Sequence, residues 1–196
     1  TFELARRVEK VTALDASRHM LKILNRKIHK HEVTNIHTVL SPWETAKVEK
    51  HDMVIASGCM YAFHRIDEAV NKMLRTANKA IAFLGDLNRK DAEGMRNLRD
   101  KFGWKIAGGR DEPLLYNVLY QMGIYPDVLV IRNLRKPMRF ANIRQAVDRL
   151  KVVLRLSNDR VPELEKELVD FVDSSTGEVD LGEVVFNEMV MVYPCK

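Results

Sequence analysis

An acidic residue, Asp15, directly follows a short apolar run at residues 11–14. Such a run is typical of a buried parallel strand. An acid at the carboxyl end of the second strand of a doubly wound sheet accepts hydrogen bonds from the ribose hydroxyls of an adenosine cofactor. Because acids after strands are also common turn and helix-cap residues, Asp15 alone leaves both interpretations open.

A second group of reactive and flexible residues lies further along the chain. Residues 51–58 resemble a buried strand that opens into a glycine loop at Ser57 and Gly58. Ligands enter an open α/β sheet beyond the carboxyl ends of its strands, so a cofactor is expected to approach this backbone. Tyr61 and His64 follow closely enough to act as general bases, although a surface or helix-capping role for His64 stays open.

The elements expected around these residues alternate between helix and strand. Helices are expected at 2–9, 17–31, 66–77, 113–122, 143–154 and 162–172. Strands are expected at 11–14, 35–40, 51–58, 80–84, 127–131 and 183–193, the last as an edge or near-edge strand. This order predicts an α/β fold with an open, mostly parallel, doubly wound sheet, helices on both faces and an antiparallel C-terminal strand. One domain is predicted over 1–196, with a substrate-pocket or cap insertion around 108–182.

The segment 4–21 closely resembles the helix–strand–acid–helix segment of class I, Rossmann-like methyltransferases that use S-adenosylmethionine. The shared features are a helix leading into a valine, a strand that ends in Asp15, then Ala16, a serine and the Met20–Leu21 pair. The resemblance runs through about residues 1–90 and continues only as topology beyond them. It implies that S-adenosylmethionine is the cofactor, that Asp15 accepts the ribose hydroxyls, and that Ala16 and Met20 line the adenosine pocket.

The same resemblance assigns further cofactor contacts. It places Pro42, Trp43 and Glu44 beside the adenine, where Trp43 offers a stacking surface, and Ser57 with Gly58 beside the methionine part. A core or rim aromatic is the other interpretation of Trp43. Nucleic-acid amino methylases of this class carry an Asn or Asp, two prolines and an aromatic at residues 56–59, where this chain has Ala-Ser-Gly-Cys. That difference argues against methylation of adenine or cytosine amino groups.

The acceptor pocket of this class is usually built in the insertion that follows the fifth strand. There Tyr116 and Tyr120 share one face of the expected helix 113–122, and the resemblance makes them candidate contacts to a small-molecule acceptor. Ordinary core packing is the alternative for this face.

The glycine loop of the class is expected upstream of Thr1. In related folds the ribose acid follows that loop by about 20 residues, whereas Asp15 has 14 residues before it. The sequence is therefore expected to lack the first strand and glycine-rich motif of the domain. A chain that begins at Thr1 is expected to bind the cofactor weakly or not at all.

The composition narrows the remaining classes. With 46% hydrophobic residues, the 196-residue chain can bury a core without disulfides or a metal, and its two cysteines fit no ligand pattern. No membrane span or signal peptide is seen, so a cytoplasmic protein is expected. The net charge of +5 is spread among acidic residues, which makes nucleic acid a weaker partner than a small acceptor. An RNA-modifying or RNA-binding protein and a non-catalytic partner subunit stay as alternatives, a nicotinamide dehydrogenase ranks below them, and oligomeric state is left open.

Overall fold

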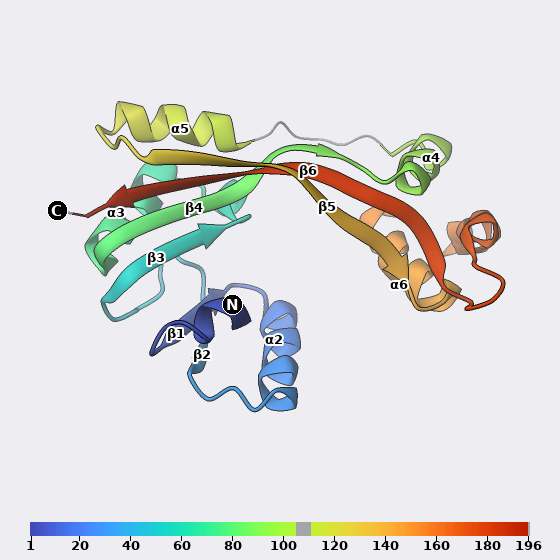
Figure 1. The fold of residues 1–196 in the computed structure, drawn as a ribbon, viewed down its shortest axis with the longest axis horizontal. Helices are drawn as coiled ribbons and strands as arrows, with labels where there is room; N and C mark the ends of the chain where they lie inside the picture. The colour runs from blue at the N-terminus through green and yellow to red at the C-terminus, as the bar shows by residue number, and fades with distance from the viewer. Residues whose placement is uncertain (105–110, 196) are drawn as a thin grey trace. The chain divides into compact units, whose positions relative to one another are not determined.

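The computed structural model describes residues 1–104 and 111–195 (Figure 1). The chain divides into two compact units. The first comprises Thr1–Val54 and Phe63–Ile81 with Cys195, and the second comprises Ile55–Ala62 and Ala82–Pro194. The single domain and its insertion at 108–182 stay predictions, and residues 108–110 lie outside the described residues. No helix in the described part of the chain is long and apolar enough to cross a membrane.

The first unit contains a two-stranded parallel sheet. Strand β1 (Val11–Asp15) pairs with β2 (Ile36–Leu40), so that Asp15 lies opposite Leu40. Helix α1 (Phe2–Ala5) precedes this sheet and α2 (Arg18–Lys30) connects its strands. As predicted, Ser17 caps α2, because its side chain accepts a hydrogen bond from the backbone N–H of Met20 at 3.3 Å.

Helix α3 (Ile66–Thr76) is the other main helix of the first unit. It buries Ala69, Val70 and Met73, whose spacing of one, three and four residues places them on one helix face. Two strands, β3 (His51–Ser57) and β4 (Ala77–Lys90), then run from the first unit into the second. The strands predicted at 51–58 and 80–84 are therefore confirmed, and the second is much longer than its apolar run.

The sheet strands fall into two groups, β1–β2 and β3-β4-β6-β5. Strands β5 (Asp127–Phe140) and β6 (Val179–Pro194) are antiparallel, with Asp127 opposite Val192. The α/β class and the antiparallel, near-edge C-terminal strand are confirmed. Among the described residues the hydrogen-bonded strands form two groups, since no strand pairs with both β1 and β3.

Burial of β3 differs from its prediction. Met53 and Ile55 are exposed, although the apolar run was expected to be buried on both faces. Met53 and Ile55 lie two residues apart and therefore share one face of β3, whereas Val54 and Ala56 on the other face are half-buried and buried.

The second unit folds around an apolar cluster at one end of the long strands β5 and β6 (Figure 1). Helices α4 (Glu93–Phe102), α6 (Ile143–Val153) and α7 (Val161–Leu168) supply most of it, with single-turn helices at Asn158–Arg160 and Val169–Phe171 nearby. The sequence prediction missed α4, whose ten residues include Gly94 and few apolar side chains. Helix α5 (Asp111–Gln121) and the short helix Met60–Ala62 complete the unit.

Candidate functional site

The carboxyl end of β1 carries the predicted ribose acceptor. One oxygen of Asp15, Oδ1, accepts a hydrogen bond from the backbone N–H of Ser17 at 2.7 Å. The backbone carbonyl of Asp15 accepts from the N–H of Ser41 at 3.2 Å, which ties the two strand ends together. Within the described chain, the second carboxylate oxygen has no hydrogen-bond partner. The hydrogen bond to Ser17 confirms the turn interpretation of Asp15, and its role as ribose acceptor stays a prediction that the second oxygen leaves possible.

The predicted adenosine contacts of the first unit lie at the same edge of the β1–β2 sheet. Ala16 and Met20 follow Asp15 in the turn and the first part of α2, and both are exposed. Pro42 and Glu44 are also exposed in the turn after β2. The parallel register brings these two turns together because Asp15 and Leu40 are partners at the strand ends.

Trp43 is anchored on α3. Its indole Nε1 donates a hydrogen bond to the carbonyl of Ala69 at 3.0 Å, and the Lys72 ammonium lies 4.8 Å from the ring centroid. Lys72 also donates to the backbone carbonyls of Trp43, Glu44 and Ala46, and burial lowers the pKa of Lys72. The partly buried Trp43 thus has the rim position that was its alternative interpretation, and its contact with adenine stays a prediction.

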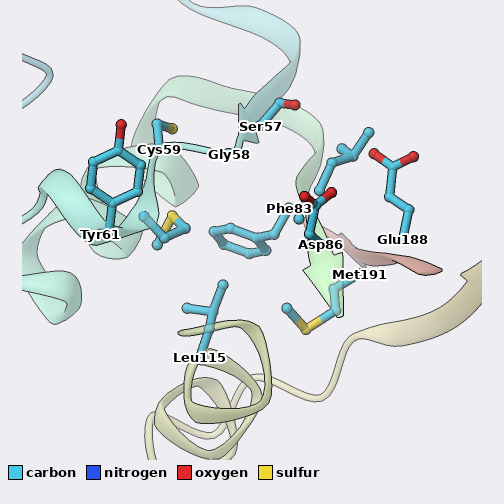
Figure 2. Close-up of a pocket in the computed structure, with 12 residues that line it drawn as sticks. Ser57, Gly58, Cys59, Tyr61, Phe83, Asp86, Leu115, Glu188 and Met191 are labelled. Carbon is cyan, nitrogen blue, oxygen red and sulfur yellow. The ribbon is translucent and has the colours of Figure 1, made fainter. Parts of the chain in front are cut away.

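A cavity of about 280 Å³ lies beside the end of β3 in the second unit (Figure 2). Gly58 has a φ of 58°, in the left-handed region that favours glycine, and its N–H donates to the carbonyl of Leu84 at 2.8 Å. This turn brings Ser57, Gly58 and Tyr61 to the cavity wall. The full lining, all of it from the second unit, is Ser57, Gly58, Cys59, Met60, Tyr61, Phe83, Leu84, Gly85, Asp86, Leu115, Glu188 and Met191.

The cavity has an apolar body and two carboxylates. Phe83, Leu115 and Met191 are almost fully buried and form its apolar side. Figure 2 shows Asp86 and Glu188 on the side of the cavity where Ser57 lies, with Tyr61 and Cys59 across from them. The described residues contain no group of three His, Cys, Asp or Glu side chains placed to hold a metal ion.

Sequence reasoning missed the two cavity carboxylates. Asp86 lies two residues beyond the strand predicted at 80–84, a position like that of Asp15 after its own strand. Glu188 stands within the predicted last strand, between Asn187 and Met189, where a charge interrupts the run. An acid at or inside a strand was thus the signal that could have found both.

The other candidates are distributed differently. Tyr61 lines the cavity although 77% of it is exposed, whereas the exposed His64 belongs to the first unit and is not among the lining residues. Tyr116 and Tyr120 are exposed and do not line the cavity, and the ring of Tyr120 packs edge-on against Tyr125 at 5.3 Å. Core packing, the alternative for these two tyrosines, is therefore wrong, and acceptor binding by them stays a prediction.

Comparison with known proteins identifies the fold. Residues 1–81 match the methyltransferase domain family. The structure resembles that of the YcgJ protein from Bacillus subtilis, with a TM-score of 0.55 at 10% identity, covering 100% of this chain and 86% of that one. It also resembles a putative methyltransferase from Bacillus halodurans, with a TM-score of 0.56 at 14% identity, covering 97% and 85% of the two chains. The chain has a class I methyltransferase fold.

A further structure with this methyltransferase fold is a putative sarcosine dimethylglycine methyltransferase from Galdieria sulphuraria. It matches with a TM-score of 0.50 at 11% identity, covering 100% of this chain and 73% of that one. No curated protein sequence matches the chain. The domain match therefore covers the part of the chain that holds Asp15, and the structural matches show the fold.

Proposed function

We propose that the protein transfers a methyl group from S-adenosylmethionine to a small-molecule acceptor. The observation that carries this proposal is the unpartnered carboxylate oxygen of Asp15, at the carboxyl end of a parallel strand inside the segment that matches the methyltransferase domain. A carboxylate in that position suits the two ribose hydroxyls of an adenosine group. The cofactor supplies a methyl group that is already activated on a positively charged sulfur.

The chain's own residues have binding and orienting roles in this proposal. Asp15 accepts from the ribose, and the exposed Ala16 and Met20 beside it cover the adenosine. Lys72 and Trp43 hold the turn that contains Pro42 and Glu44. In the proposal, this turn borders the adenine. Because an activated donor needs alignment more than covalent help, these contacts mainly fix the geometry of the displacement.

The second unit carries two further assignments, the methionine part of the cofactor at Ser57 and Gly58 and the acceptor in the cavity beside them. The open backbone at Ser57 and Gly58 faces the cavity, and Tyr61 on its wall is the better placed of the two candidate general bases, with His64 as the other. Tyr116 and Tyr120 offer exposed aromatic surface on α5 for larger acceptors. A cytoplasmic setting belongs to the same proposal, since the two cysteines fit no disulfide framework.

Ligand-induced stabilisation tests the cofactor assignment. The full-length protein is expected to unfold at a higher temperature in the presence of S-adenosylhomocysteine, because a ligand that binds only the native state stabilises it. Asp15→Asn keeps a turn-forming side chain but loses the charge, so its affinity for S-adenosylhomocysteine should fall about tenfold or more by calorimetry. Glu9→Gln, an exposed acid of the same unit, is the matched control and should bind like the unaltered protein. No thermal shift at millimolar ligand would refute the proposal.

A further inference from the structure

We infer that the cavity beside Ser57 and Gly58 binds an acceptor that carries a positively charged group on a compact apolar body. This inference rests on the proposed function and adds the chemical class of the acceptor. It uses the cavity lining of the second unit alone. Three properties of that lining carry it, namely its charge, its apolar surface and its size.

The charge of the lining is negative and uncompensated. Asp86 and Glu188 contribute two carboxylates, and no Lys, Arg or His is among the lining residues. Neither carboxylate has a hydrogen-bond or ion-pair partner in the described part of the chain. A positively charged group in the cavity would meet these two carboxylates and no competing cation of the lining.

Other acids on the same strand behave differently. On β6, Glu183 pairs with Arg135 at 3.0 Å and Asp180 pairs with Arg139 at 2.9 Å. Glu188 lies further along this strand without such a partner. Among the three acids of β6, the one that faces the cavity is therefore the one without an ion-pair partner in the described chain, which fits a ligand that supplies a positive charge.

The apolar surface and the size limit the rest of the ligand. Phe83, Leu115 and Met191 offer carbon and sulfur atoms to an apolar body, and the aromatic ring of Phe83 can also attract a cation. A volume of about 280 Å³ lies at the lower end of the range for small-molecule pockets. Phosphates and carboxylates are disfavoured because the lining offers them repulsion and no cation. The overall charge of +5 therefore does not describe this cavity.

Binding of matched probes tests the inference. Phenethylamine carries one positive charge at neutral pH, and 2-phenylethanol has nearly the same shape without the charge. The full-length protein should bind the amine about threefold to tenfold more tightly than the alcohol, as expected for partly exposed charge pairs. Added salt should narrow the difference, because screening weakens charge attraction. Equal affinity for the two probes would overturn the inference.

Two isosteric variants locate the charge. Asp86→Asn and Glu188→Gln should each weaken binding of the amine about twofold to fivefold while leaving affinity for the alcohol unchanged. Unchanged alcohol binding also shows that the cavity of the variant is intact. The control is Glu178→Gln, an exposed acid of the second unit outside the cavity, which should bind both probes normally. Normal amine binding by both cavity variants would place the cation elsewhere and overturn the inference.

S-adenosylhomocysteine separates this inference from the proposed function. The amine should still bind when the protein is saturated with S-adenosylhomocysteine, since the acceptor and the cofactor must be present together. Displacement of the amine would assign the two carboxylates to the cofactor's own amino group and overturn the inference while leaving the proposed function in place. Carboxylate-dependent amine binding without any binding of S-adenosylhomocysteine would overturn the proposed function and, with it, the identification of the amine as a methyl acceptor.

Discussion

The segment β1–α2 of the first unit and the helical cluster of the second unit differ in how completely they bury their apolar side chains. All five residues of β1 are only half-buried, and Leu21 is the one buried residue of α2. In the second unit, α4, α6 and α7 enclose a continuous cluster in which Leu150 and Leu164 are fully buried. The segment β1–α2, which carries the predicted ribose and adenosine contacts Asp15, Ala16 and Met20, is therefore less buried than the helical cluster of the second unit. The comparison teaches that binding chemistry and core packing can occupy different parts of one chain.

The largest effect is expected when a buried leucine of the second unit is removed. Leu150→Ala is expected to lower the free energy of unfolding by about 2–5 kcal/mol, because it deletes a fully buried side chain and leaves a cavity. Leu14→Ala in the half-buried β1 should cost about 1 kcal/mol. Urea unfolding followed by circular dichroism measures both. A loss for Leu14→Ala as large as that for Leu150→Ala would erase the contrast between the units.

A matched control for this experiment lies on the same helix. Val152 is 70% exposed on α6, two residues from Leu150. Val152→Ala should change the free energy of unfolding by less than about 0.5 kcal/mol, since exposed substitutions away from special features have small effects. A large loss of stability in Val152→Ala would mean that any truncation in α6, and not the burial of Leu150, lowers the free energy of unfolding.

In the first unit, hydrogen bonds from Lys72, rather than apolar packing, are expected to order the turn at 43–46. Lys72→Met removes an ammonium that donates to three carbonyls of the turn at 43–46. The free energy of unfolding should fall by about 1–3 kcal/mol, because those carbonyls lose a charged donor. Trp43 fluorescence should shift as well, since the indole loses the cation over its ring. An unchanged Trp43 spectrum together with unchanged stability would refute this anchoring role.

The control for Lys72 is a lysine of the same unit that makes a different contact. Lys79 pairs with the exposed Asp52 at 2.7 Å and does not reach the turn. Lys79→Met should therefore leave Trp43 fluorescence unchanged and alter stability by less than about 1 kcal/mol. If both variants changed the Trp43 fluorescence equally, the change would reflect the loss of any positive charge and not the contact between Lys72 and Trp43.

Local sequence signals predicted the elements better than their burial. Ser17 caps α2 and Asp15 ends β1 as expected, because capping and strand termination depend on near neighbours in sequence. The exposure of Met53 could not be predicted, since it depends on what packs against that face of β3 in the fold. The cavity could not be predicted either. Leu115 and Met191 are about 75 residues apart in sequence, and only the fold brings such residues together.

The smallest expected effect concerns an exposed turn at the start of β6. Asp173 accepts hydrogen bonds from the side chain of Ser175 at 2.6 Å and from its backbone N–H at 2.8 Å. The Ser175 hydroxyl, followed by these backbone contacts, lowers the pKa of Asp173 below its ordinary value. Because the folded-state pKa is depressed, the stabilisation is present above the ordinary aspartate pKa and is lost as the pH falls through the folded-state value.

Removing the hydroxyl should reverse that shift without affecting the core. In Ser175→Ala, the pKa of Asp173 is expected to rise towards its ordinary value, which a carboxyl-detected NMR titration measures directly. Ser174→Ala, an exposed neighbour that makes no hydrogen bond to Asp173, should leave the titration unchanged. If Asp173 of the unaltered protein already titrates at the ordinary value, the turn is not held by these bonds. The turn would then owe its order to the bridge between Val172 and Val179 and to the apolar cluster in which they pack, unlike the polar anchoring of the turn at 43–46.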